Sequence, residues 1–463
     1  ANLVRIAALS AQLKAIKTAH KILGWTMGSA ALPPRKVPKI TVGFPLGASL
    51  HALKHLHATL SFPLVAGFKT SGILSRVIQN VRNVAKRIAG LSGPVHVRYR
   101  VYVADEFANK LRPLLFVRDA SVDVSNYRAD AWQLSLAVKA TPREIFDPLS
   151  DYVYATAEVR IEGDRWEEFP LGLYRMEAPS GTHWESHSEW SLKGHSPEWL
   201  LASDYPDNLY GVPAGTGVLS AVKTILTNEA SIPPARIVFP EKDKALTTDM
   251  VFSIAQDESG STWLSICNAL LTAGGFYALQ TDAYGRFVTE DIKDLSSKPV
   301  DITYGPRDEA RPAPGISEDW EFSSFANKVI VKVSDVNQVP PLTAVAVNDD
   351  PNVEGSTTRM RRTIARIVTI QSATSQAVVD AIARHRLQIF SSFSRKVTME
   401  TLPDPRRGLR EIYRLNIPEA GVGKPLTGTW HVINWKLPLA QPPKPMQHTL
   451  TRLARVDEKE GTG

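Results

Sequence analysis

The stretch AEVRIEGDRWEEFPLGLYRM, residues 157–176, decides the fold class. In its first part the apolar residues Val159 and Ile161 alternate with charged residues, and a period of two is typical of a strand with one buried face. Gly163 and Asp164 follow directly, and this pair favours a tight turn into a second strand. The stretch therefore predicts an antiparallel hairpin in a sheet whose other face meets water.

The same alternation extends in both directions along the chain. It recurs in VHVRYRVYVAD (95–105), WQLSLAVKA (132–140) and HWESHSEWSLKG (183–194), and we expect the last to form a single strand. Further strand patterns lie at 325–334, 361–370, 395–402, 410–418, 429–439 and 446–456. The chain is therefore expected to be mainly β, with two β-rich units separated by a different block.

That block has the pattern of a small α/β domain. Residues 215–230 and 261–275 have helical patterns, and residues 276–291 predict a hairpin that turns at 282–285. The uncharged run 259–281 is too polar to be a membrane span and is interpreted as a buried helix followed by a strand. A further helix is expected at 375–392, inside the second β-rich unit.

Composition bounds the class of protein. The chain has 463 residues, of which 43% are hydrophobic and 22% charged, so it can build several folded domains. Its single cysteine, Cys267, excludes an intramolecular disulfide framework, a cysteine-based zinc site and an iron-sulfur cluster. Stability must therefore come from packing and assembly.

Charge divides the chain into two parts. Residues 1–104 contain fifteen Lys or Arg and no Asp or Glu, whereas the rest has a net charge of −8 because the total is +7. In this basic arm a helix is predicted near 71–89, with an apolar face that needs a surface to pack on. The predicted partner-binding residues of the arm are Ile73, Leu74, Val77, Ile78, Val81, Val84, Ile88, Arg76, Arg82, Lys86 and Arg87.

Four roles for the arm stay open: docking on an acidic protein partner, lying on a membrane surface, neutralising nucleic acid, or acting as an uncleaved targeting leader. Its aromatic residues, such as Trp25 and Phe44, lie in Gly/Pro-rich connectors and not between the basic residues. That placement favours an amphipathic contact over base stacking.

The sequence offers no catalytic, metal or cofactor site. His183 and His187 would lie about 13 Å apart on one extended strand, too far to share an ion. His51 and His55 are spaced for zinc, but no carboxylate exists in the arm to complete a catalytic site. The loop GVPAGTG (211–217) lacks the Gly-Lys-Ser/Thr ending of a phosphate-binding loop. We therefore expect neither an enzyme nor a bound cofactor.

The succession of elements resembles the tail-hub proteins of long-tailed bacteriophages, also called tail-associated or minor tail proteins, which are related in fold to the baseplate hub of contractile phages. The resemblance covers about residues 95–456. It rests on the strings FPLGLYRM (169–176), WLSICNALLTAGGFYALQTDAYGRFVTED (263–291), FANKVIVKV (325–333), LPDPRRGLREIYRL (402–415) and WHVINWKLPL (430–439).

The resemblance implies a homotrimer in the virion, at the tail tip, made in the host cytoplasm. Two β-barrels per chain would give six barrel units that match the hexameric tail tube to a threefold tip. The implied partners are a distal tail or tail tube protein, the tape-measure protein, and tip fibre or receptor-binding proteins. Contact of the arm with the host membrane is a further possibility, and the arm itself departs from the family's pattern.

The fold class is thus expected to be mainly β with α+β elements: two β-barrel-like hub domains with an inserted small α/β domain, preceded by a basic helical arm. The expected boundaries are 1–94 for the arm, 95–205 for the first barrel, 206–300 for the α/β domain, 301–456 for the second barrel and 457–463 for a disordered tail. The alternative functions are a tail-tip enzyme that degrades the cell wall and a hub with a membrane-perturbing arm.

Overall fold

The structure of the chain is a computed structural model that describes residues 96–453 with short gaps. The gaps are residues 115–116, 127, 140–146, 148–149, 163–164, 178–179, 184–187, 254–260, 306–314, 321–322, 336, 338–339, 352, 354, 393–394 and 421–423. The predicted arm at 1–94 and the tail at 457–463 lie outside the described residues. In the described part no helix is long and apolar enough to cross a membrane.

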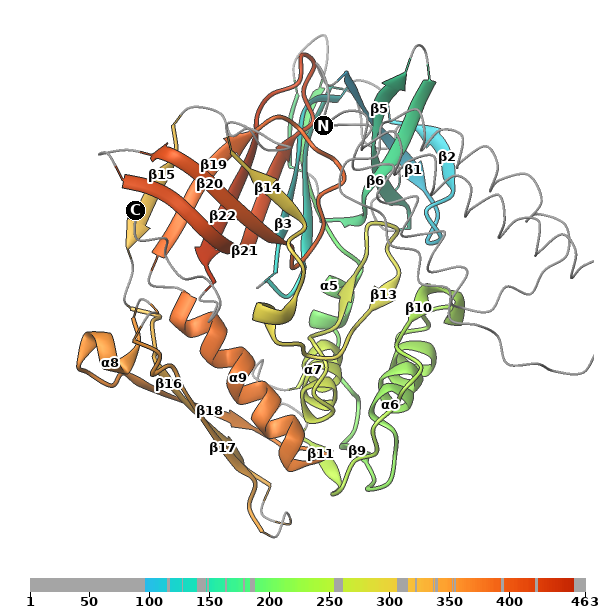
Figure 1. Cartoon of the computed structure of the whole chain (residues 1–463). Helices are drawn as coiled ribbons and strands as arrows, with labels where there is room; N and C mark the ends of the chain where they lie inside the picture. Colours follow the sequence, from blue (N-terminus) through green and yellow to red (C-terminus); the bar gives the residue numbers. More distant parts are fainter. Residues whose placement is uncertain are drawn as a thin grey trace, which may run out of the picture. The chain divides into compact units, whose positions relative to one another are not determined.

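Strands dominate the described chain (Figure 1). The strands of the first half are β1 (Val97–Ala104), β2 (Lys110–Pro113), β3 (Val117–Ser125), β4 (Trp132–Lys139), β5 (Tyr152–Glu162), β6 (Arg165–Met176), β7 (Ser180–His183), β8 (Ser188–His195), β9 (Tyr210–Val212), β10 (Ile237–Val238) and β11 (Met250–Phe252). Those of the second half are β12 (Gln280–Thr281), β13 (Phe287–Val288), β14 (Ile302–Tyr304), β15 (Ser317–Trp320), β16 (Lys328–Val333), β17 (Thr343–Val347), β18 (Ala365–Ile370), β19 (Arg395–Thr401), β20 (Ile412–Ala420), β21 (Lys424–Pro438) and β22 (Met446–Arg452).

The helices are fewer and mostly short. They are α5 (Glu198–Ala202), α6 (Val218–Thr224) with a π-helical continuation η1 (Ile225–Glu229), the 3-10 turns η2 (Pro234–Arg236) and η3 (Leu295–Ser297), α7 (Trp263–Ala273), α8 (Thr357–Met360) and α9 (Gln376–Ser392). The mainly β class with α+β elements is therefore confirmed, and most strands and helices that periodicity predicts within the described residues are present.

The predicted hairpin at 157–176 is confirmed as the antiparallel pair β5 and β6. Its motif FPLGLYRM contains Gly172, which has a φ of +127° beside a shift in the pairing register. A Cβ atom at Gly172 would come within 2.3 Å of the Tyr174 hydroxyl, which donates a hydrogen bond to the carbonyl of Leu171 at 2.5 Å. Glycine is thus required where β6 bulges.

One 14-stranded sheet contains strands from both expected barrels, in the order β15-β19-β22-β21-β3-β4-β8-β6-β5-β1-β2, with β14, β20 and β7 off this path. Strand β21 makes the connection. Its residues up to His431 pair with β20, whereas Leu437 lies opposite Val122 of β3. A register shift between Val432 and Asn434 marks the change of partner, because a bulge bends a strand.

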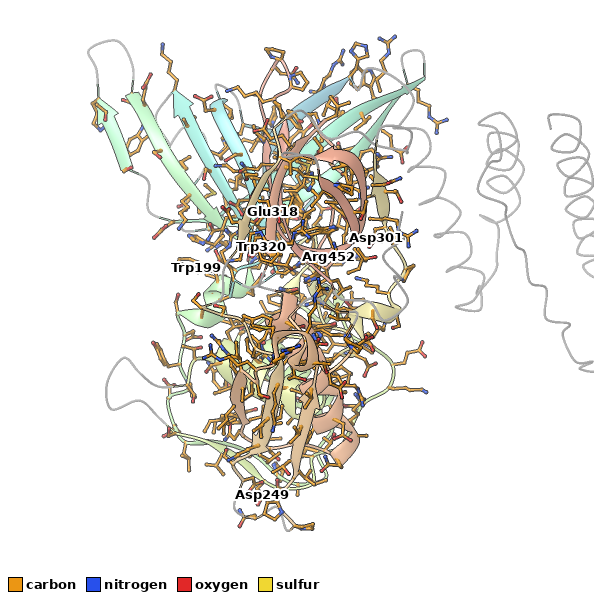
Figure 2. All side chains as sticks on the ribbon, turned by 60° about the vertical axis from the view of Figure 1, so that its left-hand side comes forward. Trp199, Asp249, Asp301, Glu318, Trp320 and Arg452 are labelled. Carbon is orange, nitrogen blue, oxygen red and sulfur yellow. The ribbon has the colours of Figure 1, made fainter. Side chains whose placement is uncertain are left out.

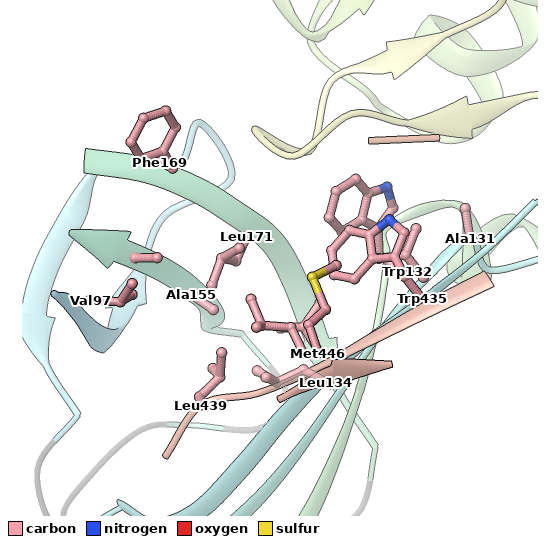
Figure 3. Close-up of a cluster of buried hydrophobic side chains, with 14 of the residues drawn as sticks. Val97, Ala131, Trp132, Leu134, Ala155, Phe169, Leu171, Trp435, Leu439 and Met446 are labelled. Carbon is pink, nitrogen blue, oxygen red and sulfur yellow. The ribbon is translucent and has the colours of Figure 1, made fainter. Parts of the chain in front are cut away.

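The two sets of strands also share a hydrophobic core (Figure 3). Trp132 of β4 and Trp435 of β21 meet edge to face, with their ring centroids 5.6 Å apart. Leu134 and Met446 are both fully buried in the same cluster. The core therefore continues across the junction between β21 and β3.

The α/β block predicted at 206–300 has its own core, around α6 and α7. Helix α7 buries Cys267, as the apolar surroundings of this cysteine predicted, and burial raises the pKa of its thiol to about 12. The predicted hairpin that turns at 282–285 is the antiparallel pair β12 and β13. The interpretation of 259–281 as a buried helix followed by a strand is confirmed for the described part of that run.

A second small sheet, in the order β17-β16-β18, has one face covered by α9 (Figure 1). Strands β16 and β18 run parallel, so the chain crosses over between them. Their sequence patterns place two of these strands, at 325–334 and 361–370, in the second β-rich unit. They form a separate sheet because the buried residues of β16, such as Val329 and Val331, pack against α9.

The prediction of one strand at 183–194 is wrong. β7 and β8 pair antiparallel, and His183 lies opposite Ser188, so the chain reverses between them. The His183 ring contacts the Trp190 ring edge to face at 5.3 Å, and its Nδ1 lies 2.9 Å from the Ser188 hydroxyl. Polar and aromatic residues alternate along the whole segment, so the sequence pattern does not indicate that the chain reverses direction.

Candidate functional site

The eleven partner-binding residues predicted in the arm, between Ile73 and Ile88, lie outside the described residues. The structure therefore does not place them, and their role stays a prediction. The same holds for His51, His55 and the rest of the basic arm. The described residues, 96–453 with the gaps given above, form the body of the protein.

In the described part of the chain, no three His, Cys, Asp or Glu side chains gather in a way that could hold a metal ion. The loop 211–217 leads into α6, but the N-terminus of that helix is already occupied. The Asp243 carboxylate accepts hydrogen bonds from the backbone N–H groups of Leu219 and Ser220, at 2.8 and 3.0 Å. Burial alone would raise the pKa of Asp243, yet these hydrogen bonds lower it overall.

Asp243 was not found by sequence reasoning, because it caps a helix that begins 25 residues earlier. A Cβ atom at Gly217 would lie 2.2 Å from the Asp243 carboxylate, which explains the glycine that ends the loop. The N-terminus of α6 is therefore capped by a side chain of the protein itself, and the loop 211–217 is not a phosphate-binding loop.

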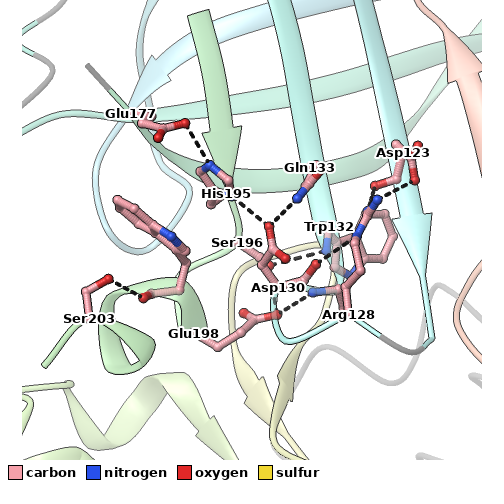
Figure 4. A network of polar contacts seen from close by, with 12 residues as sticks. Asp123, Arg128, Asp130, Trp132, Gln133, Glu177, His195, Ser196, Glu198 and Ser203 are labelled. Carbon is pink, nitrogen blue, oxygen red and sulfur yellow. Dashed lines mark hydrogen bonds and ion pairs between the residues drawn. The ribbon is translucent and has the colours of Figure 1, made fainter. Parts of the chain in front are cut away.

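A buried glutamate joins the first set of strands to the α/β block (Figure 4). Glu198 is fully buried at the start of α5. One carboxylate oxygen accepts from the Ala131 backbone at 3.1 Å and the Ser196 hydroxyl at 2.7 Å, and the other accepts from the Thr281 hydroxyl at 2.6 Å. Burial raises the pKa of Glu198, although these hydrogen bonds oppose the shift. The contacts hold the β12–β13 hairpin against β4.

His195 lies beside this junction and is positioned on three sides (Figure 4). Its Nδ1 is 2.6 Å from the carboxylate of Asp130, and its Nε2 is 3.3 Å from that of Glu177. The Trp199 ring stacks on the imidazole at a centroid distance of 4.8 Å. The cluster connects β8 and α5 with the residues that precede β4 and follow β6.

Arg410 makes a second joint, between the second set of strands and the α/β block. Its guanidinium reaches Glu290 at 3.0 Å and the amide oxygen of Gln280 at 2.6 Å, and it lies over the Tyr277 ring. Its backbone N–H donates to the Asn126 side chain at 2.9 Å. One residue thus connects the hairpin β12–β13, the end of β3 and the start of β20.

The string LPDPRRGLREIYRL contains a buried charge cluster that sequence reasoning also missed. Arg407 is 4% exposed and lies 3.1 Å from Asp404 and 3.3 Å from Glu411. Burial opposes its charge, but the two carboxylates raise the pKa of Arg407 well above its ordinary value. Glu411 also accepts from the Tyr413 hydroxyl at 3.2 Å. The sign of this cluster in the sequence is the high number of charged residues in a segment that is otherwise rich in strand patterns.

The outer edge of the second set of strands carries another arginine contact. Arg395 of β19 forms an ion pair with Glu318 of β15 at 2.5 Å and lies over the Trp320 ring. Figure 2 shows Glu318, Trp320 and Arg452 in the β-rich half and Asp249 at the opposite end of the body. This contact therefore joins two neighbouring strands of the 14-stranded sheet.

Comparisons with known proteins agree with the fold. No family model matches the chain, and no curated protein matches its sequence. The tail protein from Neisseria meningitidis MC58 is similar in structure, with a TM-score of 0.50 and 15% identity over 77% of this chain and 96% of that one. The 43 kDa tail protein of prophage MuSo2 from Shewanella oneidensis matches with a TM-score of 0.48 and 13% identity, covering 76% and 98% of the two chains.

The prophage tail protein gp18 from Listeria monocytogenes EGD-e matches with a TM-score of 0.45 and 13% identity, covering 76% of this chain and 94% of that one. The likeness to the Neisseria protein shows that the described body has the fold of a tail protein. The resemblance to a tail-hub-related fold is therefore confirmed, whereas the two β-barrel domains and the helical arm stay predictions.

Proposed function

We propose that the chain is a structural hub of a bacteriophage tail tip, located in the virion after synthesis in the host cytoplasm. The observation that carries the proposal is the tail-protein fold, which extends over 77% of the chain. In the proposed assembly three copies adapt the hexameric tail tube to the distal tip, with tip fibre or receptor-binding proteins beyond them.

The architecture supports a load-bearing role. The two sets of strands share one sheet and one core through β21, so a force applied to one set is transmitted to the other by backbone hydrogen bonds. Glu198 and Arg410 then tie the α/β block to both sets. A body joined in this way suits a component that holds its shape while neighbours bind.

The predicted partner of the arm is the tape-measure protein. The arm has an apolar helical face and only positive formal charges, so an acidic helical partner at the axis would cover both features. Substituting Val77 and Val81 by Asp should block tail assembly or DNA delivery while the body stays folded. Normal infectivity after deletion of the arm would contradict this part of the proposal.

The decisive experiment is imaging of particles with a label at the C-terminus of the chain, combined with native mass measurement of the purified protein. The expected results are a label at the tail tip and a complex of three chains. A label on the capsid or along the tail shaft would contradict the proposal. A purified body that stays monomeric in the presence of the tail tube protein would contradict the trimer.

Two alternatives have distinct signatures. A tail-tip enzyme would clear cell-wall substrate in a zymogram, and changing one carboxylate or histidine would abolish the clearing. An arm that perturbs membranes would release dye from liposomes in the absence of other tail proteins. Either result would change the assignment of the corresponding part of the chain.

A further inference from the structure

The small sheet β17-β16-β18 has an apolar outer face. Its inner face is covered by α9, and side chains alternate, so every second residue points outward. Val345 lies opposite Ile330, and Ile330 lies opposite Ile367, which gives an apolar row across all three strands. Val345 and Ile367 are 58% and 61% exposed. Ile330, between them, is half-buried, and Figure 2 brings this side of the body forward.

Two lysines share the face with the apolar row. Lys328 and Lys332 flank Ile330 along β16 and, like it, alternate with the buried Val329 and Val331. Among the described residues neither ammonium group lies within ion-pair distance of a carboxylate. A matching surface must therefore combine apolar side chains with carboxylates.

The basic arm does not meet that requirement, because residues 1–104 contain no Asp or Glu. The body does. The loop 203–209, between α5 and β9, exposes Asp204 and Asp207 together with Tyr205 and Leu209, which are 40% and 64% exposed. The loop is held in place, because its Asp204 carbonyl accepts from the Trp263 backbone at 3.0 Å.

These two surfaces of one chain are separated by packed helices. The sheet packs on α9, the backbone before α9 bonds to the end of α7 through Thr374 and Ala273, and the start of α7 holds the loop 203–209. Figure 1 shows, from left to right, the sheet β17-β16-β18, then α9, then α7. A surface and its complement at different places on one chain make a head-to-tail contact between copies, and such contacts close into rings when the rotation permits.

We infer that the outer face of β17-β16-β18 binds the loop 203–209 of a second copy of this chain. The apolar row covers Tyr205 and Leu209 of the partner copy, and the two lysines meet its two carboxylates. The inference rests on the proposed function, since it names the contact by which the copies of the hub assemble.

Cross-linking in assembled particles tests the inference with the full chain. Ile367→Cys and Leu209→Cys are introduced together, and particles are treated with a short bis-maleimide. Buried Cys267 is 0% exposed and is not expected to react. The expected product is a ladder that ends at three linked chains of 50.9 kDa, about 153 kDa. Each single variant should give no ladder, because residue 367 of one copy faces residue 209 of the next copy and not another residue 367.

A charge exchange gives an independent readout in the purified full chain. Lys328→Glu with Lys332→Glu should weaken self-association at least tenfold, as should Asp204→Lys with Asp207→Lys, and all four changes together should restore it. Lys223→Glu with Lys242→Glu is the matched control, because both lysines are exposed in the α/β block. Circular dichroism checks that every variant is folded.

The outcomes separate this inference from the proposed function. A tip-located chain that cross-links through residue 367 to another virion protein, or not at all, would overturn the inference and leave the function standing. Charge reversals that leave self-association unchanged would also overturn it. Particles that lack the chain would refute both.

Discussion

The strands β3–β6 and β19–β22 belong to one sheet but bury different chemistry. The first group buries aliphatic side chains such as Val122, Leu134 and Leu171. The second group and its connecting loop also bury Arg407 and Glu411. An apolar interior does not depend on pH, whereas a buried ion cluster stabilises only while each charge has its partner. Backbone hydrogen bonds thus join two regions whose stability should respond differently to substitutions and to pH.

Removal of Arg407 should have the largest effect. Arg407→Met leaves the Glu411 carboxylate buried without its cation, while Asp404 keeps its ion pair with Arg406, and should lower the free energy of unfolding by about 3 to 5 kcal/mol. Lys436→Met, at an exposed position of β21, is the control and should change it by about 0.5 kcal/mol or less. Urea titration followed by tryptophan fluorescence measures both. A loss for Arg407→Met as small as that of the control would mean that the cluster contributes no stability.

The first group should respond to lost volume instead. Leu134→Ala removes a fully buried side chain from the core and should cost about 3 kcal/mol through lost burial and the cavity left behind. The loss should be equal at pH 7 and pH 5. Leu402→Ala, at a side chain that is 66% exposed, is the matched control. A loss that changed with pH would contradict the view that Leu134 packs in an apolar part of the core.

Acidification should lower the stability of the second group of strands and of the Arg410 contacts beside it. Burial lowers the pKa of His448, His431 and His385 to about 3, from an ordinary 6.5. The unfolded chain therefore takes up protons first as the pH falls. Stability should be constant above about pH 6.5 and then fall towards pH 3 by about 1.4 kcal/mol per pH unit for each histidine.

His448→Gln tests this sign. The glutamine keeps a polar side chain near Thr401 and Tyr413 but does not titrate, so the slope of stability against pH should decrease by one histidine's share. Denaturant titrations at pH 6, 5 and 4 measure the slope, and Leu134→Ala should retain the full slope. An unchanged slope in His448→Gln would show that this histidine keeps its ordinary pKa.

The smallest effect is expected outside both groups, at the start of α6. Asp243→Asn removes the charge that accepts from Leu219 and Ser220 and should cost about 1 kcal/mol. Glu241→Gln, an exposed neighbour, should be nearly neutral. A loss comparable to that of Arg407→Met would place Asp243 among the buried structural charges rather than among helix caps.

Local patterns predicted much of this structure. The alternation at 157–176 gave a hairpin, the apolar run around Cys267 gave the buried helix α7, and the turn at 282–285 gave β12 and β13. The residues that make the polar contacts between elements were harder to predict from the sequence. Asp243, Glu198 and Arg407 act through partners that are distant in sequence or packed from other elements, and no local spacing indicates such contacts.

By itself the sequence determined many of the strands and helices and that a basic arm precedes an acidic body, because periodicity and charge depend on neighbouring residues. Only the tertiary structure decided that β21 leaves β20 to pair with β3, where Asn126 and Val432 bond across 306 residues. It also decided which face of β17-β16-β18 receives α9 and which stays exposed. Those choices follow from the complementarity of whole surfaces, which forms only when distant segments meet.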